Sequence, residues 1–100
     1  MEKLSTDEIE TYLSGDLPGW SVLGDAITRA YQFCDFNQAI QFVNAVAAAA
    51  EGAQHHPDIL IRFNKVSLTL STHDAGGITE RDMKFAIETD GIARDIGEES

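Results

Sequence analysis

All three histidines of the chain lie within 19 consecutive positions, and histidine is the side chain best suited to carry protons at neutral pH. His55 and His56 are adjacent in the stretch EGAQHHPD, and His73 follows in STHDAGG. Glu51 stands four residues before His55, so their side chains can share one face at the end of a helix. Such a cluster predicts either a metal site or groups that give and take protons.

The two kinds of site make different demands on this spacing. Two histidines and a carboxylate form the ligand set of non-haem iron sites, and three histidines suit zinc, so a metal site on Glu51, His55 and His73 is one alternative. However, adjacent imidazoles fit a single ion poorly, and the chain has no HExxH pattern. Proton transfer is favoured because histidine titrates near pH ~6.5, so that one imidazole can be an acid while another is a base. We therefore expect a site without a metal or other cofactor.

N-cap pairs, hydrophobic periodicity and turn residues predict the elements that position these side chains. Three pairs mark the starts of helices: Ser5 with Glu8, Asp35 with Gln38, and Thr79 with Asp82. The expected elements are a first helix that ends at the turn 14–19, strands at 20–23 and 26–34, a central helix at 36–51, strands at 58–63 and 66–72, and a last helix at about 80–90 that Gly91 weakens. The turn between the later strands is expected at Asn64-Lys65, with Asn64 at positive φ.

This order, α-ββ-α-ββ-α, predicts an α+β fold, with helices packed on one face of a four-stranded antiparallel sheet. One hundred residues are expected to form a single domain, residues 1–100. The apolar stripes of the helices and strands predict its core. The expected core residues are Leu4, Ile9, Leu13, Ile27, Tyr31, Phe33, Phe36, Ile40, Val43, Val46, Val66, Leu68, Leu70, Met83 and Ile87.

The charge of the chain restricts the kinds of partner. It has 17 acidic and 7 basic residues and a net charge of −10, which disfavours direct binding to nucleic acid or to a membrane surface. Its longest apolar run, 45–50, is too short to span a bilayer, and its first ten residues do not resemble a signal peptide. A single cysteine, Cys34, fits a reducing compartment. These features predict a cytoplasmic protein.

The spacing of the chemical residues resembles the signature of the pterin-4a-carbinolamine dehydratases. It is made of Glu51, three residues, His55-His56-Pro57, five residues, the aromatic Phe63, nine residues, His73, eight residues and Asp82. The stretches GW, AITRAYQFCDFNQAIQF, NKV and STHDAGGITERD are also similar to that family, so the resemblance extends from residue 4 to residue 90. Two positions depart from it, since members often carry Asn where Ile61 stands and Tyr where Phe63 stands.

The resemblance implies an enzyme that removes water from a 4a-hydroxytetrahydropterin and gives a quinonoid dihydropterin. This step recycles the pterin of the aromatic amino acid hydroxylases and requires neither a metal nor a redox cofactor. It also implies that the catalytic residues are His55, His56 and His73. We expect His55 and His73 to share the acid and base roles, His56 mainly to bind the pterin, and Glu51 to orient His55.

Supporting roles in substrate binding are expected for four further residues. Asp82 belongs to the signature, although its larger role is expected to be capping the last helix with Thr79. Pro57 forces His56 into an extended conformation. Arg81 and Trp20 are weaker candidates, and Trp20 is expected in the core or at the rim of the site.

A binding module is the alternative from another functional class, because some relatives act as dimerisation cofactors of a homeodomain transcription factor. Intact histidines favour an enzyme, since a pure binding module would not require them. The open edges of the sheet, together with the assembly of relatives, predict a homodimer or homotetramer.

Overall fold

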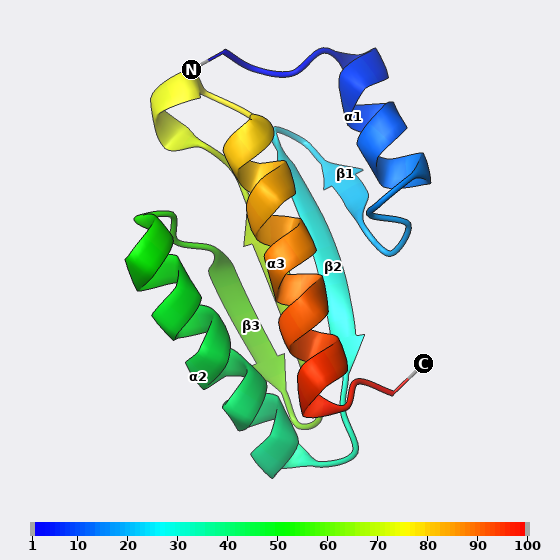
Figure 1. Cartoon of the computed structure of the whole chain (residues 1–100), viewed down its shortest axis with the longest axis vertical. Helices are drawn as coiled ribbons and strands as arrows, with labels where there is room; N and C mark the ends of the chain where they lie inside the picture. Colours follow the sequence, from blue (N-terminus) through cyan, green and yellow to red (C-terminus); the bar gives the residue numbers. More distant parts are fainter. Residues whose placement is uncertain (1, 100) are drawn as a thin grey trace.

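A computed structural model describes residues 2–99 of the chain as one sheet covered by helices (Figure 1). The observed order confirms the expected α+β arrangement and adds one short 3-10 helix. The elements are α1 Thr6–Ser14, β1 Ser21–Leu23, β2 Ala26–Gln32, α2 Phe36–Ala53, β3 Asp58–Arg62, β4 Lys65–Leu70, the 3-10 helix η1 His73–Ala75, and α3 Glu80–Ile96.

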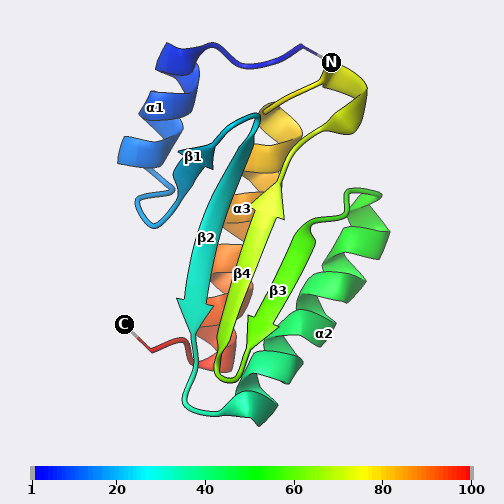
Figure 2. The ribbon, with the colours of Figure 1, turned by 180° about the vertical axis from the view of Figure 1, so that it is seen from behind.

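The sheet has four antiparallel strands in the order β1-β2-β4-β3 (Figure 2). Each hairpin joins a central strand to an edge strand, and the central strands β2 and β4 pair with each other from Ile27 opposite Leu70 to Gln32 opposite Lys65. The short β1 and the fully exposed β3 are therefore the two edges.

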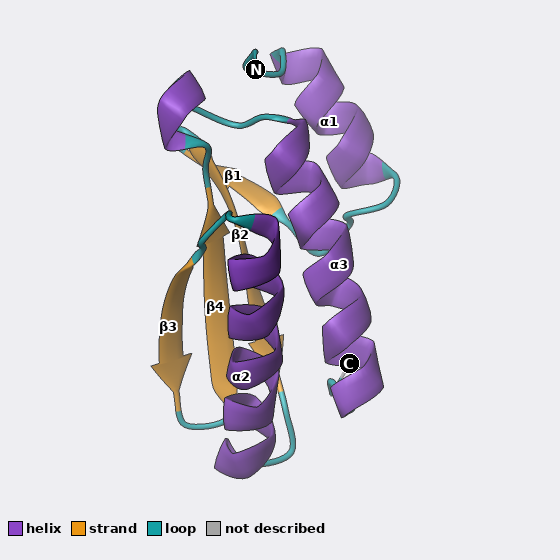
Figure 3. Cartoon of the chain, turned by 60° about the vertical axis from the view of Figure 1, so that its left-hand side comes forward, coloured by secondary structure: helices purple, strands orange, loops and turns teal. Residues whose placement is uncertain are grey.

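The helices α2 and α3 lie on one face of this sheet, and the other face is left uncovered (Figures 2 and 3). The side chains of β2 and β4 that point toward the helices form the centre of the core. Across the sheet and the helices, the predicted core residues that are fully buried are Ile27, Tyr31, Phe33, Val46, Val66, Leu68, Leu70 and Met83. Leu4, Ile9, Leu13 and Val43 are partly buried against this core, and Ile40 is also half-buried.

The prediction of burial is wrong for two residues: Phe36 is 49% exposed and Ile87 is 40% exposed. The apolar surface of α2 is wider than the face that the sheet covers. Its buried residues are Ala39, Phe42, Val46 and Ala50. Phe36 belongs to a neighbouring stripe and lies in the first turn of the helix, where the sheet does not cover it.

Several predicted element ends and one turn also differ; β2 and β4, for example, each end two residues early, at Gln32 and Leu70. In the β3–β4 turn Phe63 has the positive φ of 52°, whereas the sequence favoured Asn64; Asn64 instead donates from its side-chain amide to the Phe33 carbonyl. The last helix continues through Gly91 to Ile96. A helical glycine costs only about 1 kcal/mol, and packing of Ile92, Ala93 and Ile96 against the core offsets that cost.

A buried carboxylate ties the second half of α3 to β2. Oδ1 of Asp90 accepts hydrogen bonds from Trp20 Nε1 at 3.0 Å, from Arg29 Nη1 at 2.7 Å and from the Tyr31 hydroxyl at 2.5 Å. Arg29 also contacts Glu98 after the helix, at 2.5 Å. These contacts fix the position of α3 over the sheet and hence the position of its N-terminus.

Among residues 2–99, no helix is both long and apolar enough to cross a bilayer.

Candidate functional site

The C-terminus of α2, the end of β4, η1 and the N-terminus of α3 converge at one end of the molecule (Figure 1). Gln54 ends α2 in the left-handed conformation, with φ 54° and ψ 40°. The next amide, that of His55, donates to the Ala50 carbonyl at 3.1 Å and holds the chain against the helix end. Pro57 then directs the backbone into β3. Three segments of the chain therefore supply the side chains of one site.

A pocket of about 370 Å³ lies where these segments meet. All three histidines line it, together with residues of the loops on either side. The full lining is Gln54, His55, His56, Pro57, Asp58, Ser71, Thr72, His73, Asp74 and Arg81. A smaller hollow of about 60 Å³ shares His56 and His73 with this pocket and extends over the uncovered face of the sheet.

His55 is buried against a carboxylate from α3. Its Nε2 lies 2.6 Å from Oδ1 of Asp82, whose side chain is fully buried. The other oxygen of Asp82 accepts from the Thr79 amide at 2.9 Å and from the Thr72 hydroxyl at 2.9 Å. Asp82 therefore caps α3, as the sequence predicts, and also holds the imidazole of His55.

His56 has a different carboxylate partner. Its Nε2 lies 2.5 Å from Oε2 of Glu51, and both side chains are exposed, 62% for His56 and 78% for Glu51. The expectation that Glu51 orients His55 is therefore wrong. Pro57 places His56 in an extended segment, so the two adjacent imidazoles diverge and only that of His56 meets the last turn of α2.

His73 lies on the opposite side of the pocket, at the start of η1. The backbone around it is held by a bridge between Thr72 and Gly77, in which the Thr72 amide donates to the Gly77 carbonyl at 2.9 Å. The side chain of His73 is exposed and contributes to both hollows. The structure thus brings His73 to the same pocket as His55 and His56.

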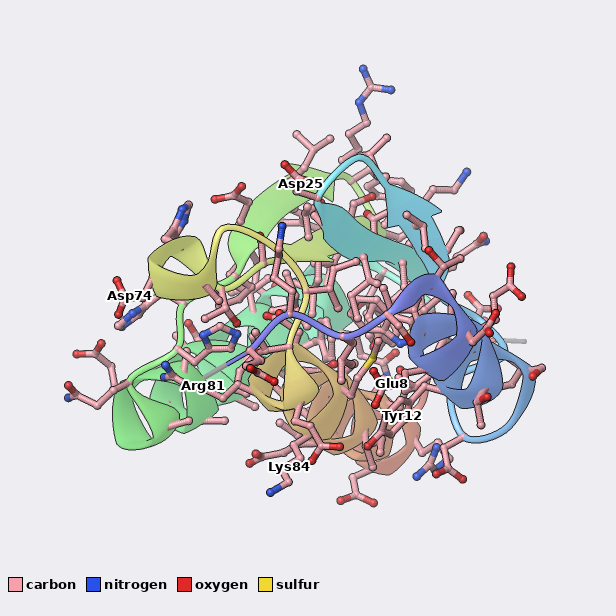
Figure 4. All side chains as sticks on the ribbon, turned by 90° about the horizontal axis from the view of Figure 1, so that it is seen from above. Glu8, Tyr12, Asp25, Asp74, Arg81 and Lys84 are labelled. Atoms are coloured by element: carbon pink, nitrogen blue, oxygen red, sulfur yellow. The ribbon has the colours of Figure 1, made fainter. Side chains whose placement is uncertain are left out.

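The remaining predicted residues separate into two places. Arg81 lines the pocket and donates from Nη2 to the Gln54 carbonyl at 2.8 Å, which joins the start of α3 to the end of α2. Figure 4 places Arg81 and Asp74 at the same side of the molecule, away from Glu8 and Tyr12 on α1. Trp20 is not at the pocket; it is 4% exposed, in the core, and its indole donates to Asp90.

The arrangement of the carboxylates also bears on metal binding. Within residues 2–99, no group of three or more His, Cys, Asp and Glu side chains has the proximity needed to hold a metal ion. Glu51, His55 and His73 are not brought together as a ligand set, because His55 is paired with Asp82 and Glu51 with His56. The geometry therefore gives the metal-site alternative no support.

Sequence reasoning missed Thr72 and other polar residues of the pocket lining. Asp58, Ser71 and Asp74 lie within two residues of a histidine in the sequence. Only this proximity could have identified them as pocket residues. Thr72 directly precedes His73, but its contact with Asp82 forms only when β4 and α3 meet.

Comparison with known proteins agrees with this geometry. The family model described as pterin 4 alpha carbinolamine dehydratase matches residues 2–92. The chain belongs to that family. A protein of Koribacter versatilis assigned this activity by name is 54% identical over 87 residues, which cover 86% of this chain and 92% of that protein. A protein of Thermomicrobium roseum with the same assignment is 52% identical over 86 residues, covering 86% and 91%.

Solved structures place the same fold in proteins with further described roles. A transcriptional coactivator/pterin dehydratase from Brucella melitensis matches with a TM-score of 0.87 and 37% identity, over 92% of this chain and 99% of that chain. A pterin dehydratase-like protein, described as a RuBisCO assembly factor in the alpha-carboxysome, matches with a TM-score of 0.62 and 25% identity, over 74% and 86%.

Proposed function

We propose that this protein is a hydro-lyase that removes water from a 4a-hydroxytetrahydropterin to give the quinonoid dihydropterin. The observation that carries the proposal is the convergence of all three histidines on one pocket, in a chain that belongs to the dehydratase family. The pocket volume of about 370 Å³ lies within the range usual for sites that bind small molecules. In this role the enzyme recycles the pterin of the aromatic amino acid hydroxylases.

The reaction is a proton transfer at two atoms. One imidazolium protonates the hydroxyl on C4a, the C4a–O bond breaks, and water leaves. A neutral imidazole takes the proton from N5 as the C4a–N5 double bond forms. Atoms and electrons balance without an oxidant, a reductant or a metal, and each positioned proton transfer contributes roughly 10²- to 10⁴-fold to the rate.

Within this proposal His55 and His73 transfer the protons and His56 mainly binds the pterin. Burial of His55 against Asp82 supports a fixed orientation, which proton transfer requires. The exposed pair of His56 and Glu51 supports a contact that adapts to the substrate. Pro57, Arg81 and Asp82 support these side chains from the pocket wall and from beneath it.

The test is an assay with chemically generated 4a-hydroxytetrahydropterin and no added cofactor. We expect the purified protein to accelerate dehydration above the spontaneous rate, and we expect the double variant His55→Ala, His73→Ala to lose that acceleration. No acceleration with any common pterin side chain would remove the enzyme proposal. A stoichiometric metal found by elemental analysis, with activity lost on chelation, would contradict the metal-independent chemistry.

A binding function is the second candidate, because the Brucella relative is described as a transcriptional coactivator as well as a dehydratase. Here the partner would be a protein, since the net charge of −10 repels nucleic acid. A triple variant, with His55, His56 and His73 all changed to alanine, separates the two functions: binding of a protein partner should survive loss of all three imidazoles, and dehydration should not. We also propose that the protein is a homo-oligomer and that it resides in the cytoplasm. The exposed free thiol of Cys34 supports this location, because the cytoplasm is reducing.

A further inference from the structure

A layer of buried polar side chains continues from the pocket lining into the first turn of α3, and the proton transfers above give part of it no role. It consists of Thr72, Thr79 and Asp82, none of which is more than 4% exposed. The Thr72 hydroxyl lies 2.8 Å from the Thr79 hydroxyl and 2.9 Å from Oδ2 of Asp82. These three side chains link the end of β4 to the first turn of α3.

The chemistry of the groups fixes the direction of each hydrogen bond. An ionised carboxylate only accepts, and a hydroxyl has one hydrogen to donate. Thr72 therefore donates its hydrogen to Asp82, and Thr79 must donate to Thr72. The Thr79 oxygen also accepts from the Arg81 amide at 3.2 Å. The result is a one-way chain of hydrogen bonds, Thr79 to Thr72 to Asp82.

The same logic fixes the hydrogen on His55. Its Nε2 lies 2.6 Å from Oδ1 of Asp82, and a carboxylate oxygen requires a donor there. A neutral imidazole has one N–H, so Nδ1 is the nitrogen with the free lone pair. Within residues 2–99, Nδ1 of His55 has no hydrogen-bond partner and is not sealed from solvent, and His55 lines the pocket.

We propose that Thr72 is a positioning residue of the dehydratase, whose hydroxyl holds Asp82 so that His55 is the Nε2–H tautomer and transfers protons through Nδ1. Loss of the hydroxyl leaves a buried carboxylate oxygen with one donor fewer, and Asp82 then rotates to find another. The kinetic consequence rests on the proposed function, whereas the tautomer does not. Thr72 also directly precedes His73, so one residue is coupled to both proton-transferring histidines.

The first test is ¹⁵N NMR of the histidine rings at alkaline pH, once the spectra show each imidazole in its neutral form with one N–H. Three histidines give a simple spectrum. We expect His55 to be Nε2–H in the wild type, a mixture of tautomers in Thr72→Val, and Nε2–H again in Thr72→Ser. Thr89→Val is the matched control, since Thr89 is equally buried but bonds to Tyr31 in another network. It should leave the His55 tautomer unchanged.

The second test is kinetic. We expect Thr72→Val to lower kcat about tenfold with little change in KM, because it weakens the orientation of a proton carrier rather than substrate binding. Thr72→Ser should restore most of the rate, and Thr89→Val should keep it. Wild-type kcat and an unchanged tautomer in Thr72→Val would overturn the proposal, as would a Thr72→Ser variant no better than Thr72→Val.

Asp82→Asn provides an independent measurement if Thr72→Val does not fold. Donors from Thr72 and Thr79 require the amide oxygen to face them, so the amide nitrogen faces His55 and donates to Nε2. The tautomer should therefore switch to Nδ1–H, and an unswitched spectrum would contradict the proposal. A wild-type protein with no dehydratase activity would remove the proposed function and the kinetic consequence but not the tautomer, whereas Nδ1–H in the wild type would remove this inference alone.

Discussion

At the scale of single residues, the two adjacent histidines occupy opposite environments. The side chains of His55 and Asp82 are 8% and 0% exposed, so their interaction is strong and their geometry is fixed. The pair of His56 and Glu51 is exposed to solvent, where water and salt weaken an ion pair and the side chains keep their freedom. The fixed imidazole of His55 suits proton transfer, and the mobile imidazole of His56 suits substrate binding.

Alanine variants of the histidines should therefore separate into two kinetic classes. His55→Ala and His73→Ala should lower kcat by roughly 10²- to 10⁴-fold each, because each removes a proton-transfer group. His56→Ala should mainly raise KM, because it removes binding felt equally in the ground and transition states. Steady-state kinetics on variants with wild-type circular dichroism measure both. Wild-type kcat in folded His55→Ala and His73→Ala protein would contradict the proton-transfer roles.

The members of the site were predictable from the sequence, but their pairing was not. The spacing from Glu51 to Asp82 identified which side chains gather, because that spacing belongs to a known family. The position of Glu51 in the sequence was compatible with contact to either histidine. The turn made by Gln54 and Pro57 brings His56, and not His55, to Glu51. Nothing in the sequence marked Thr72 as part of the site, because threonine is common in strands for its packing in the sheet.

Both tyrosines should resist ionisation in the folded protein. Burial and the hydrogen bond to Asp90 raise the pKa of Tyr31 far above its usual value, and the hydrogen bond to Glu80 raises the pKa of Tyr12. A raised pKa gives stability that is present below about pH 10, the unfolded value, and is lost as pH rises above it. Absorbance at alkaline pH should show phenolate from Tyr31 appearing together with unfolding. Titration of both tyrosines near pH ~10 in still-folded protein would contradict this.

At the scale of the elements, α3 is held by two buried carboxylates, one in its first turn and one just past its middle. Asp82 in its first turn joins it to His55 and Thr72, and Asp90 two turns later joins it to β2 and Trp20. The first contact is part of the site, and the second fixes the helix that carries it. Displacement of α3 would therefore move Asp82 relative to His55.

Removal of the second carboxylate should be costly. Asp90→Ala leaves the Tyr31 hydroxyl and the Trp20 indole without their acceptor, and each buried donor left unpaired costs about 1–3 kcal/mol, whereas Arg29 keeps Glu98. Denaturant unfolding should show this loss of stability. Asp95→Ala is the control: Asp95 lies on the same helix but is exposed, so its loss should change stability by less than about 0.5 kcal/mol. A similarly small effect of Asp90→Ala would show that the network does not fix α3.

The types and order of the elements followed from local patterns, whereas their ends followed from tertiary packing. The three N-cap pairs form as predicted because capping is a contact within one turn. The end of α3 depends on Ile92 and Ile96 reaching the core, which outweighs the helix-breaking tendency of Gly91. The exposure of Phe36 depends on which part of α2 faces the sheet, and periodicity alone leaves that choice open.

At the scale of the whole molecule, the longer of the two edge strands of the sheet, β3, is unprotected. Every residue of β3 is exposed, and its sequence DILIR carries three consecutive apolar residues between Asp58 and Arg62. Phe63 beside it is 70% exposed. Edge strands of monomers are usually blunted by charges or bulges, so a strand with charges only at its ends favours pairing with another strand.

A second copy of this chain is a complementary partner for that edge. Antiparallel pairing of two β3 strands about a two-fold axis at Leu60 places Asp58 of each copy opposite Arg62 of the other. We therefore expect at least a dimer at micromolar concentration in about 0.15 M salt, where the charge of −10 per chain is screened beyond ~8 Å. Light scattering should return a mass of at least twice 10.9 kDa.

The variant Leu60→Lys tests which edge pairs. Leu60 is 57% exposed and lies opposite Ser67 on the uncovered face, so lysine there leaves the core intact but places two like charges beside the proposed axis. The matched control is Leu23→Lys, at a 61% exposed position on the other edge strand, β1. Leu60→Lys should lower the mass in light scattering, to 10.9 kDa if β3 is the only interface, and Leu23→Lys should not. A monomeric wild type would refute the assembly, and dissociation by Leu23→Lys alone would assign it to β1.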